Sequence, residues 1–331
     1  MDMKIQHALC VILLLSSSTT YSDEMSGKWK EGFSGNAMLL FGVTQSDSLA
    51  DSGNKKLNSL DDKGEAKTEG FIYPIAASNV NYTFSGGNHQ LFLGTSNADI
   101  ALGRPHFELG YGQYINKIGI FKVSYVPGLL KSTTWEDPFL VGSNREETDQ
   151  RIQGIRLQYQ EIFDTGLGFE LAAGQRKIDD ELSASQFSPT IQSELNRESD
   201  IYYSELSYLT PLSPKLFLRS SLAYLRQNAK GNAMSSDTYT GQLAVVQKFE
   251  RSALTISFKY QYANFDDTHP IFLEKQEDDI VGIVSTYTYD DIFGWPGVGV
   301  AVMGGFTEKV SNLDFYEGSS WILASGVRYV F

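Results

Sequence analysis

The sequence predicts an all-β fold, a transmembrane antiparallel up-and-down β-barrel of about 14 strands with long extracellular loops and short periplasmic turns. Apolar and polar residues alternate along most of the chain, an apolar N-terminal segment leads into small residues, and long connections alternate with tight turns. Alternation places apolar side chains on one face of a strand and polar ones on the other. A membrane barrel needs this pattern because one face meets lipid and the other faces the lumen.

Residues 1–22 have the order of a secretory signal peptide. A basic residue precedes an apolar run at 8–15, and serines and threonines follow it up to Ser22. This order predicts cleavage after Ser22 and a mature barrel over 23–331. A buried first helix is the alternative, but a segment that is apolar on every side has no amphipathic face to dock. Cys10, the single cysteine, lies in the apolar run, so the mature chain would hold no disulfide or Cys-based metal site.

Fourteen segments show the alternation of a strand. It is clearest at 254–262, where apolar or aromatic side chains occupy one face and Thr, Ser, Lys and Gln the other. An even number of strands returns the C-terminus to the periplasmic side, as single-chain barrels require. Residues 89–102 are irregular, and loss of that hairpin would leave a barrel of twelve strands. The segments are 32–43, 69–84, 89–95, 100–115, 118–127, 148–160, 166–176, 199–210, 215–226, 237–249, 252–264, 279–290, 297–308 and 319–331.

The connections between these segments alternate in length. Long, polar and acidic stretches are separated by pairs of strands that short turns join. A soluble β-sandwich has no reason to sort its loops in this way, whereas outer-membrane barrels do so. Whether the first long loop folds into the lumen is left open. The long stretches are 44–68, 130–147, 177–198 and 266–279, and the turns are 85–88, 116–117, 211–214 and 250–251.

The last segment places Trp321, Leu323, Val327, Tyr329 and Phe331 on one face. A final strand that ends on an aromatic residue resembles the signature by which the barrel assembly machinery recognises outer-membrane barrels. Any edge strand can end in Phe, but here the residue accompanies a signal peptide and sorted loops. The sequence therefore predicts the assembly machinery as a partner, recognised through Phe331, and the outer membrane of a Gram-negative bacterium as the location.

Three stretches of the sequence resemble an uncharacterised family of outer-membrane proteins from marine Gram-negative bacteria. They are NKKLNSLDDKG at 54–64, LFLGTS at 91–96 continuing to FELGY at 107–111, and WEDPFLV at 135–141. The similarity covers most of the mature chain. Because the family has no assigned activity, the resemblance implies location and topology and transfers no functional residues.

The composition and the motifs argue against nucleic-acid binders and enzymes. Asp and Glu number 40 against 27 Lys and Arg, a net charge of −13, which disfavours binding to phosphate. His89, His106 and His269 show no metal-ligand spacing, and no Ser nucleophile pairs with them. Paired aspartates such as Asp278 and Asp279 lack the spacing of a calcium loop, so solvated turns are the favoured interpretation. The sequence predicts no catalytic residue, no cofactor and no metal site.

Charged residues opposite the apolar face are the candidates for a lumen lining. A charge on the lipid face would cost about 2–4 kcal/mol near the midplane, so these side chains are expected to point inward. Basic residues outnumber acidic ones on this face, which predicts a weak preference for anions. The candidate pore-lining residues are Lys122, Arg156, Arg219, Lys248, Lys259, Arg328, Glu108, Glu170 and Glu205.

These expectations favour a porin-like channel for passive diffusion of small hydrophilic solutes, because a barrel of this size leaves water in its lumen. The alternative is a non-conducting surface barrel whose acidic extracellular loops bind a partner, a surface or lipopolysaccharide. Outer-membrane lipid is the expected surrounding of the barrel in both cases. The sequence leaves the solute, the pore size and the choice between monomer and trimer open.

Overall fold

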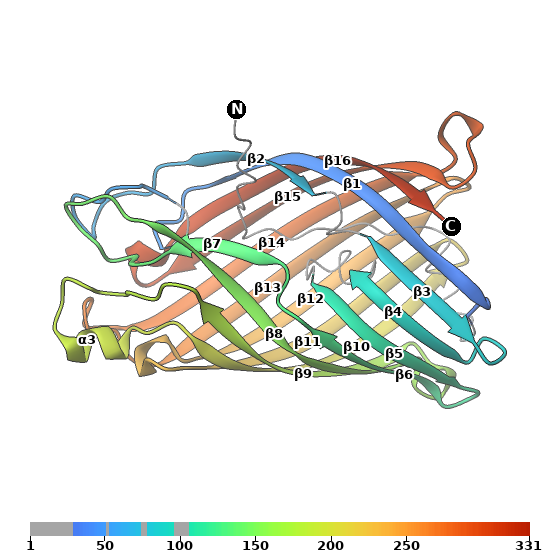
Figure 1. Cartoon of the computed structure of the whole chain (residues 1–331), viewed down its shortest axis with the longest axis horizontal. Helices are drawn as coiled ribbons and strands as arrows, with labels where there is room; N and C mark the ends of the chain where they lie inside the picture. Colours follow the sequence, from blue (N-terminus) through green and yellow to red (C-terminus); the bar gives the residue numbers. More distant parts are fainter. Residues whose placement is uncertain (1–28, 51–52, 74–77, 96–105) are drawn as a thin grey trace.

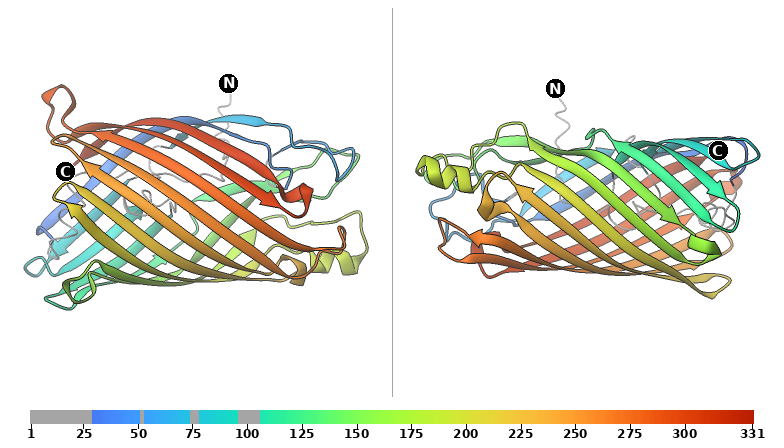
Figure 2. Two further views of the ribbon diagram at one scale, coloured as in Figure 1. Left: turned by 180° about the vertical axis from the view of Figure 1, so that it is seen from behind. Right: turned by 90° about the horizontal axis from the view of Figure 1, so that it is seen from below.

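The computed structural model describes residues 29–50, 53–73, 78–95 and 106–331, and these form one closed antiparallel barrel (Figures 1 and 2). The predicted signal peptide at 1–22 lies outside the described residues. The strands are β1 Gly32–Ser46, β2 Lys67–Tyr73, β3 Asn79–Phe84, β4 His89–Thr95, β5 Phe107–Ile115, β6 Gly119–Val126, β7 Lys131–Trp135, β8 Glu147–Gln160, β9 Leu167–Ile178, β10 Ser199–Ser213, β11 Leu216–Ala229, β12 Ser236–Lys248, β13 Ser252–Thr268, β14 Lys275–Tyr289, β15 Val298–Ser311 and β16 Gly318–Val330.

These sixteen strands occupy fourteen positions around the ring. The strands β2 and β3 both pair with β1, one along each half of it, and β6 and β7 divide one edge of β8 in the same way. The break between β6 and β7 follows Pro127, which donates no backbone hydrogen bond, and contains Gly128 at a φ of 70°. The predicted fold class and its fourteen strands are therefore confirmed, and the twelve-strand alternative is wrong.

The strands run further toward the long loops than the alternation predicts. The predicted loop at 130–147 is wrong in its first part, because β7 pairs there with β8. Likewise β1 continues to Ser46 and β13 to Thr268, within stretches predicted as loops. In these extensions polar side chains occupy both faces of the strand. The alternation of apolar and polar residues therefore ends before the backbone pairing does. The predicted strand at 100–115 is described only from Phe107.

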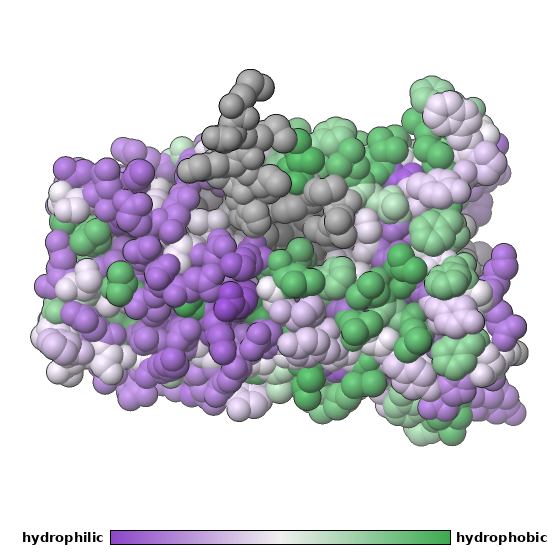
Figure 3. All heavy atoms as spheres, viewed as in Figure 1, coloured by the Kyte–Doolittle hydropathy of each residue, from purple (hydrophilic) through white to green (hydrophobic). Residues whose placement is uncertain are grey.

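An apolar belt surrounds the barrel. Outward side chains on neighbouring strands, such as Leu243, Phe258 and Ile283, are apolar and exposed. Figure 3 shows apolar residues gathered toward one end of the visible face and hydrophilic residues at the other end. The residues that alternate with these outward ones face the inside of the barrel, and they include Gln242, Lys259 and Gly282 on the same three strands. The outside of the barrel therefore has the character of a surface that meets lipid.

The long connections 47–66, 136–146 and 179–198 lie at the same end of the barrel, as predicted, whereas the other described connections at that end are no longer than 161–166 and 290–297 at the opposite end. One end, called the short-turn end, holds the connections 85–88, 116–118, 161–166, 214–215, 249–251 and 290–297. The other end, called the long-loop end, holds 47–66, 136–146, 179–198, 230–235, 269–274 and 312–317. The loop at 179–198 contains the helix α3, Pro189–Glu194, whose N-cap Ser188 accepts a hydrogen bond from the backbone of Ile191. In the part of the chain that the structure describes, no helix is long and apolar enough to cross a membrane.

The strands β1 and β16 close the ring. They pair in antiparallel register from Asn36 opposite Val330 to Ser46 opposite Ser320. Beyond this ladder, the backbone N–H of Gly35 donates to the carbonyl of Phe331 at 3.0 Å, and that of Phe331 donates back at 3.1 Å. Phe331 is therefore part of the seam of the barrel, with its backbone fixed independently of its side chain.

Candidate functional site

All nine candidate pore-lining residues lie at inner positions of the barrel strands. Each alternates with outward neighbours, as Lys259 does between the exposed side chains of Phe258 and Tyr260. Their part in conduction stays a prediction. They stand on nine strands: Glu108 on β5, Lys122 on β6, Arg156 on β8, Glu170 on β9, Glu205 on β10, Arg219 on β11, Lys248 on β12, Lys259 on β13 and Arg328 on β16.

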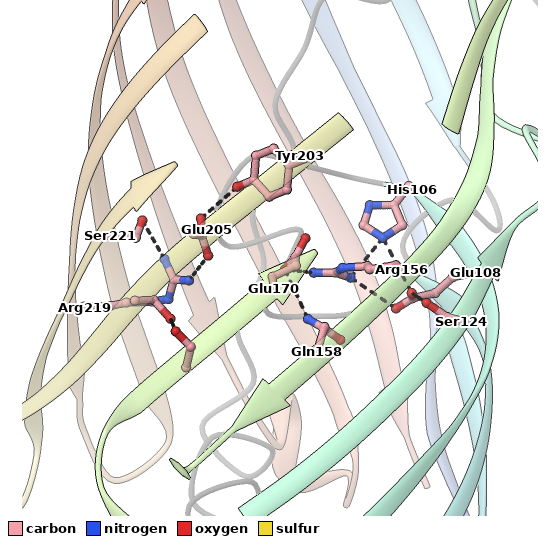
Figure 4. A network of polar contacts seen from close by, with 12 residues as sticks. His106, Glu108, Ser124, Arg156, Gln158, Glu170, Tyr203, Glu205, Arg219 and Ser221 are labelled. Carbon is pink, nitrogen blue, oxygen red and sulfur yellow. Dashed lines mark hydrogen bonds and ion pairs between the residues drawn. The ribbon is translucent and has the colours of Figure 1, made fainter. Parts of the chain in front are cut away.

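Arg156 is the centre of the larger of two ion-pair networks on this face (Figure 4). Its Nη2 lies 2.7 Å from Oε2 of Glu170, and its Nη1 lies 3.5 Å from Oε1 of Glu108. The same Nη1 is 3.0 Å from Nε2 of His106. Ser124 donates to Oε2 of Glu108 at 2.5 Å. One guanidinium on β8 thus holds carboxylates from β5 and β9 together across β6 and β8.

The second network lies on β10 and β11. Nη2 of Arg219 is 2.5 Å from Oε1 of Glu205, and its Nη1 donates to Oγ of Ser221 at 3.1 Å. Tyr203 donates to the other oxygen of Glu205 at 2.9 Å. Because carboxylates compensate both Arg156 and Arg219, these two arginines contribute less to a preference for anions than the sequence suggests. The inner faces of β5 to β11 that carry the two networks are called the charged wall.

The side of the lumen that faces the charged wall is more apolar. Inner positions on β14, β15, β16 and β1 hold apolar side chains together with uncharged polar ones such as Thr286 and Thr44, and they alternate with exposed outward ones such as Val302. The described charged side chains there form two ion pairs near the ends of the wall. Arg328, near the short-turn end, pairs with Asp290, and Lys309 pairs with Asp278 toward the long-loop end. The inner apolar residues are Met38, Leu40, Val284, Ala301, Met303, Ile322 and Ala324. The lumen therefore has a charged wall and an apolar wall.

The long loops build a hydrophobic core of their own, here called the loop cap. Each of the six described long loops contributes at least one buried or partly buried side chain to it. Its buried members are Leu49, Leu57, Phe139, Ala184, Leu195, Ala233, Met234, Leu313, Phe315 and Tyr316. Segments that the sequence marks as polar and acidic thus pack together at the long-loop end.

The loop cap spans the mouth of the barrel from side to side. The ring of Phe139, in the loop before β8, stacks on that of Phe315, in the loop after β15, with centroids 5.2 Å apart. Along the ring, β15 is followed by β14, β13, β12, β11, β10, β9 and β8, so β8 stands seven positions from β15 in a ring of fourteen. Strands seven positions apart are diametrically opposite. The contact between Phe139 and Phe315 therefore bridges the mouth.

Two buried polar side chains tie three of these loops together. Arg145 is 1% exposed and donates to the backbone carbonyls of Leu49 at 2.7 Å and Pro138 at 3.0 Å. Its guanidinium also lies 4.3 Å from the ring centroid of Trp135. Asp137 accepts hydrogen bonds from backbone N–H groups of its own loop and of the loop at 179–198. The first long loop, whose placement the sequence left open, joins the loop cap through Leu49.

His269 is fully buried in the loop cap. Its Nε2 is 3.0 Å from the hydroxyl of Tyr316, and the rings of Phe139 and Phe272 pack against it. Its Nδ1 accepts from the backbone N–H groups of Ile271 and Phe272. Burial lowers the pKa of His269 from 6.5 to about 4. The residue is therefore neutral at neutral pH, with both ring nitrogens occupied inside the cap.

We expect acid to loosen the loop cap. The pKa of His269 is depressed in the closed cap, so its stabilising contribution is complete above pH 6.5 and is lost as the pH falls toward 4. The full loss corresponds to about 3 kcal/mol. Hydrogen exchange of cap amides should be compared between wild type and His269→Phe at each pH, which cancels the intrinsic pH dependence of exchange. The exchange rate of wild type divided by that of His269→Phe should rise as the pH falls. A ratio that stays constant with pH would contradict this role of His269.

The other two described histidines and several of the paired aspartates have protein partners. His106 joins the charged wall, and Nδ1 of His89 lies 2.5 Å from the hydroxyl of Tyr111. Asp266 pairs with Arg226, and Asp179 pairs with Lys131. Within the described ranges, no group of three His, Cys, Asp or Glu side chains could hold a metal ion.

Sequence reasoning missed the polar residues that hold the loop cap. Arg145 and Asp137 lie in a loop without periodicity, and their partners are backbone groups of distant loops. The one signal available was the cluster of aromatic and apolar residues at 135–141, which the sequence singles out only as a point of family resemblance.

Comparison with solved structures finds distantly similar membrane barrels. The chain is similar to the outer membrane channel DcaP of Acinetobacter baumannii, with 8% identity, a TM-score of 0.43, and coverage of 96% of this chain and 100% of that one. It is similar to the COG4313 outer membrane channel from Pseudomonas putida F1, with 8% identity, a TM-score of 0.46, and coverage of 92% and 97%. It is also similar to the anion-selective porin from Comamonas acidovorans, with 9% identity, a TM-score of 0.40, and coverage of 91% of this chain and 100% of that one.

No curated protein matches the chain. A family model described as a protein of unknown function, DUF2860, matches residues 32–330. The predicted resemblance to an uncharacterised family is thereby confirmed, while its restriction to marine bacteria stays a prediction. Because the match spans the barrel from β1 to β16, the chain belongs to the DUF2860 family of proteins of unknown function.

Proposed function

We propose that the protein is an outer-membrane channel for passive diffusion of small hydrophilic solutes, with an outer mouth that the loop cap covers. The observation that carries this proposal is the charged wall: two ion-pair networks line the inside of a closed ring whose outside carries an apolar belt. Barrels of fourteen positions are wide enough to leave water between their inner side chains. The inner position of these charged side chains places them beside the path that solutes would take.

Purified protein in a planar bilayer should give discrete current steps. We expect the open fraction in wild type to be small at neutral pH, because the stacked rings of Phe139 and Phe315 bridge the mouth. The measurement therefore needs a variant with a weakened loop cap beside wild type. Absence of current steps from both proteins, with insertion verified by protease protection, would rule out the channel.

The loop cap also supports a second candidate, a non-conducting surface barrel whose loops bind a partner, a surface or lipopolysaccharide. Its loops are fixed by a common core and by the clamps at Arg145 and Asp137, so they present a defined outer surface. Binding to lipopolysaccharide vesicles with no current from any variant would favour this candidate. In both candidates we infer that the protein is not an enzyme.

We infer that the protein reaches the outer membrane through the assembly machinery and that Phe331 takes part in recognition. The backbone of Phe331 pairs with Gly35, so replacing the side chain leaves the seam of the barrel in place. Phe331→Ser should lower the amount in the outer membrane and raise the amount in the periplasm, measured by fractionation. Tyr329→Ser, on the same outward face, is the matched control and should have the smaller effect. Equal outer-membrane levels of wild type and Phe331→Ser would contradict this role.

A further inference from the structure

Two turns at the short-turn end share one backbone shape and a similar sequence, in which an acidic residue is followed by Ile and Phe. The turn between β8 and β9 contains EIFD at 161–164, and the turn between β14 and β15 contains DIFG at 291–294. In each, the N–H of the fourth residue donates to the carbonyl of the first at 3.0 Å, and the next N–H donates to the carbonyl of the second at 3.1 Å. The turns stand on separate hairpins and repeat the same local design.

The repeated design holds a phenylalanine in a left-handed conformation. Phe163 has a φ of 54° and Phe293 a φ of 57°, and the acidic residue that starts each turn is left-handed as well. Residues with a Cβ rarely adopt this conformation, and a bulky aromatic residue does so less often than Asn or Gly. The backbone conformation of these turns is therefore energetically unfavourable for phenylalanine, and it sets the direction in which each ring projects.

Both rings point away from the protein. Phe163 is 70% exposed and Phe293 is 83% exposed. Trp295, which follows the second turn, is 60% exposed, and its ring lies 5.9 Å from that of Phe293 in an edge-to-face arrangement. Large aromatic side chains exposed to this degree leave apolar area that water solvates poorly. An apolar or amphipathic environment would therefore solvate these three rings better than water does.

The second turn continues the apolar belt outward. It connects β14 and β15 and projects away from the barrel wall, at the upper right in Figure 1 and the upper left in the left view of Figure 2. The outward side chains just before it are Tyr287 and Tyr289, and Tyr329 is exposed on the neighbouring strand β16. A surface that covers these belt residues therefore also reaches the turn.

The first turn is fixed against its neighbour. The backbone N–H of Phe163 donates to the carbonyl of Ile118 at 2.8 Å, and the hydroxyl of Tyr159 donates to the same carbonyl at 2.9 Å. Ile118 is itself exposed. This contact joins two turns of the rim into one rigid platform from which the ring of Phe163 projects.

We propose that the two turns are lipid anchors, which place Phe163, Phe293 and Trp295 at the boundary between headgroups and acyl chains of the leaflet at the short-turn end. The proposal rests on the proposed membrane location. Rings at this boundary keep their apolar faces in contact with lipid while the indole N–H stays hydrated. The acidic side chains of Glu161 and Asp291 beside the rings argue against recognition of anionic headgroups, so the attraction is apolar and should not weaken in high salt.

The test uses Trp295 as the reporter and Trp321 as the reference. Trp321 lies on the outward face of β16, toward the long-loop end, so it reports whether the belt is in lipid at all. Two single-tryptophan proteins, with the remaining tryptophans replaced by Phe, are reconstituted in phosphatidylcholine vesicles brominated either near the headgroup or at the chain end. We expect bromine near the headgroup to reduce Trp295 emission by roughly half, more than chain-end bromine does, and equally at low and high salt.

The outcomes separate the two proposals. Quenching of Trp321 without quenching of Trp295 would overturn the anchor and leave the membrane location standing, and it would show that the turns meet water or a soluble partner. Quenching of neither would overturn the membrane location. If removal of tryptophans prevents folding, Trp295→Cys and Trp321→Cys, each labelled with an environment-sensitive dye, give the same comparison, because residues 23–331 contain no other cysteine.

Variants test the role of the repeated phenylalanines. Phe163→Ser/Phe293→Ser should reduce the quenching of Trp295 by lipid while leaving that of Trp321 unchanged. Leu273→Ser is the matched control, because Leu273 is 79% exposed but lies in a loop at the opposite end. A double variant that leaves Trp295 quenching unchanged, or a Leu273→Ser variant that reduces it equally, would overturn the assignment of the anchors to these turns.

Discussion

Phe139→Ser is expected to open the outer mouth and to raise the ratio of open to closed channels by about two orders of magnitude or more. Phe139 is 1% exposed and its ring contacts both His269 and Phe315. Replacing a buried phenylalanine by a small side chain costs about 3–5 kcal/mol. Because the lost contacts lie in the loop cap, this cost falls on closing the cap, and the strand pairing of the barrel is left in place. Single-channel recording of wild type and variant at the same pH measures the effect.

Two matched variants show whether the effect belongs to the bridge across the mouth. Phe139→Leu keeps an apolar side chain in the core and should open the channel less than Phe139→Ser does. Leu273→Ser removes an exposed apolar side chain from the same end and should change nothing. If wild type conducts and Phe139→Ser conducts identically, the loop cap does not limit permeation. The lumen would then contain another path for solutes.

The strands were predictable because each carries its own pattern. In β13 the alternation from Leu254 to Tyr262 fixes which face is apolar without knowledge of any neighbour. The breaks in the wall were less visible. Pro127 and Gly128 stop the pairing of β6 with β8, but the polar strand β7 that resumes it has no apolar face to reveal it.

The loop cap was not predictable by the same reasoning. Its apolar members, among them Leu57, Phe139 and Phe315, are isolated within polar stretches and become a core only when six loops converge. Periodicity describes contacts within one element, whereas this core depends on contacts between loops from opposite sides of the ring. The left-handed turns at Phe163 and Phe293 were missed because nothing in a sequence such as EIFD marks a positive φ.

The inner positions of the candidate site were predictable, but their pairing was not. Alternation places Arg156 and Glu170 on the inner face of their strands one at a time. Their contact depends on the register between β8 and β9, which sets Gln158 opposite Glu170 and so brings the carboxylate within 2.7 Å of the guanidinium. Register is a property of two strands, and a shift of one residue would send every side chain to the other face.

Arg156→Met is expected to destabilise the barrel by about 3–5 kcal/mol, because it removes the cation that stands between two carboxylates in the lumen wall. Glu108 and Glu170 then lose their contacts with the guanidinium, while Met fills similar space. The midpoint of urea unfolding in detergent micelles measures the loss. The carboxylates also remain as uncompensated negative charge beside the path of ions, so the reversal potential across a KCl gradient should shift toward cations.

The triple variant Arg156→Met/Glu108→Gln/Glu170→Gln separates the ion-pair network from the packing of the arginine stem. It removes the cation together with the two carboxylates, so it should recover most of the lost stability and return the reversal potential toward that of wild type. If Arg156→Met and the triple variant are equally unstable, the stem of Arg156 matters through its packing and the charges do not. If the single variant leaves the reversal potential unchanged, ions do not pass along the charged wall, and the permeation path must follow the apolar wall built by β14, β15, β16 and β1.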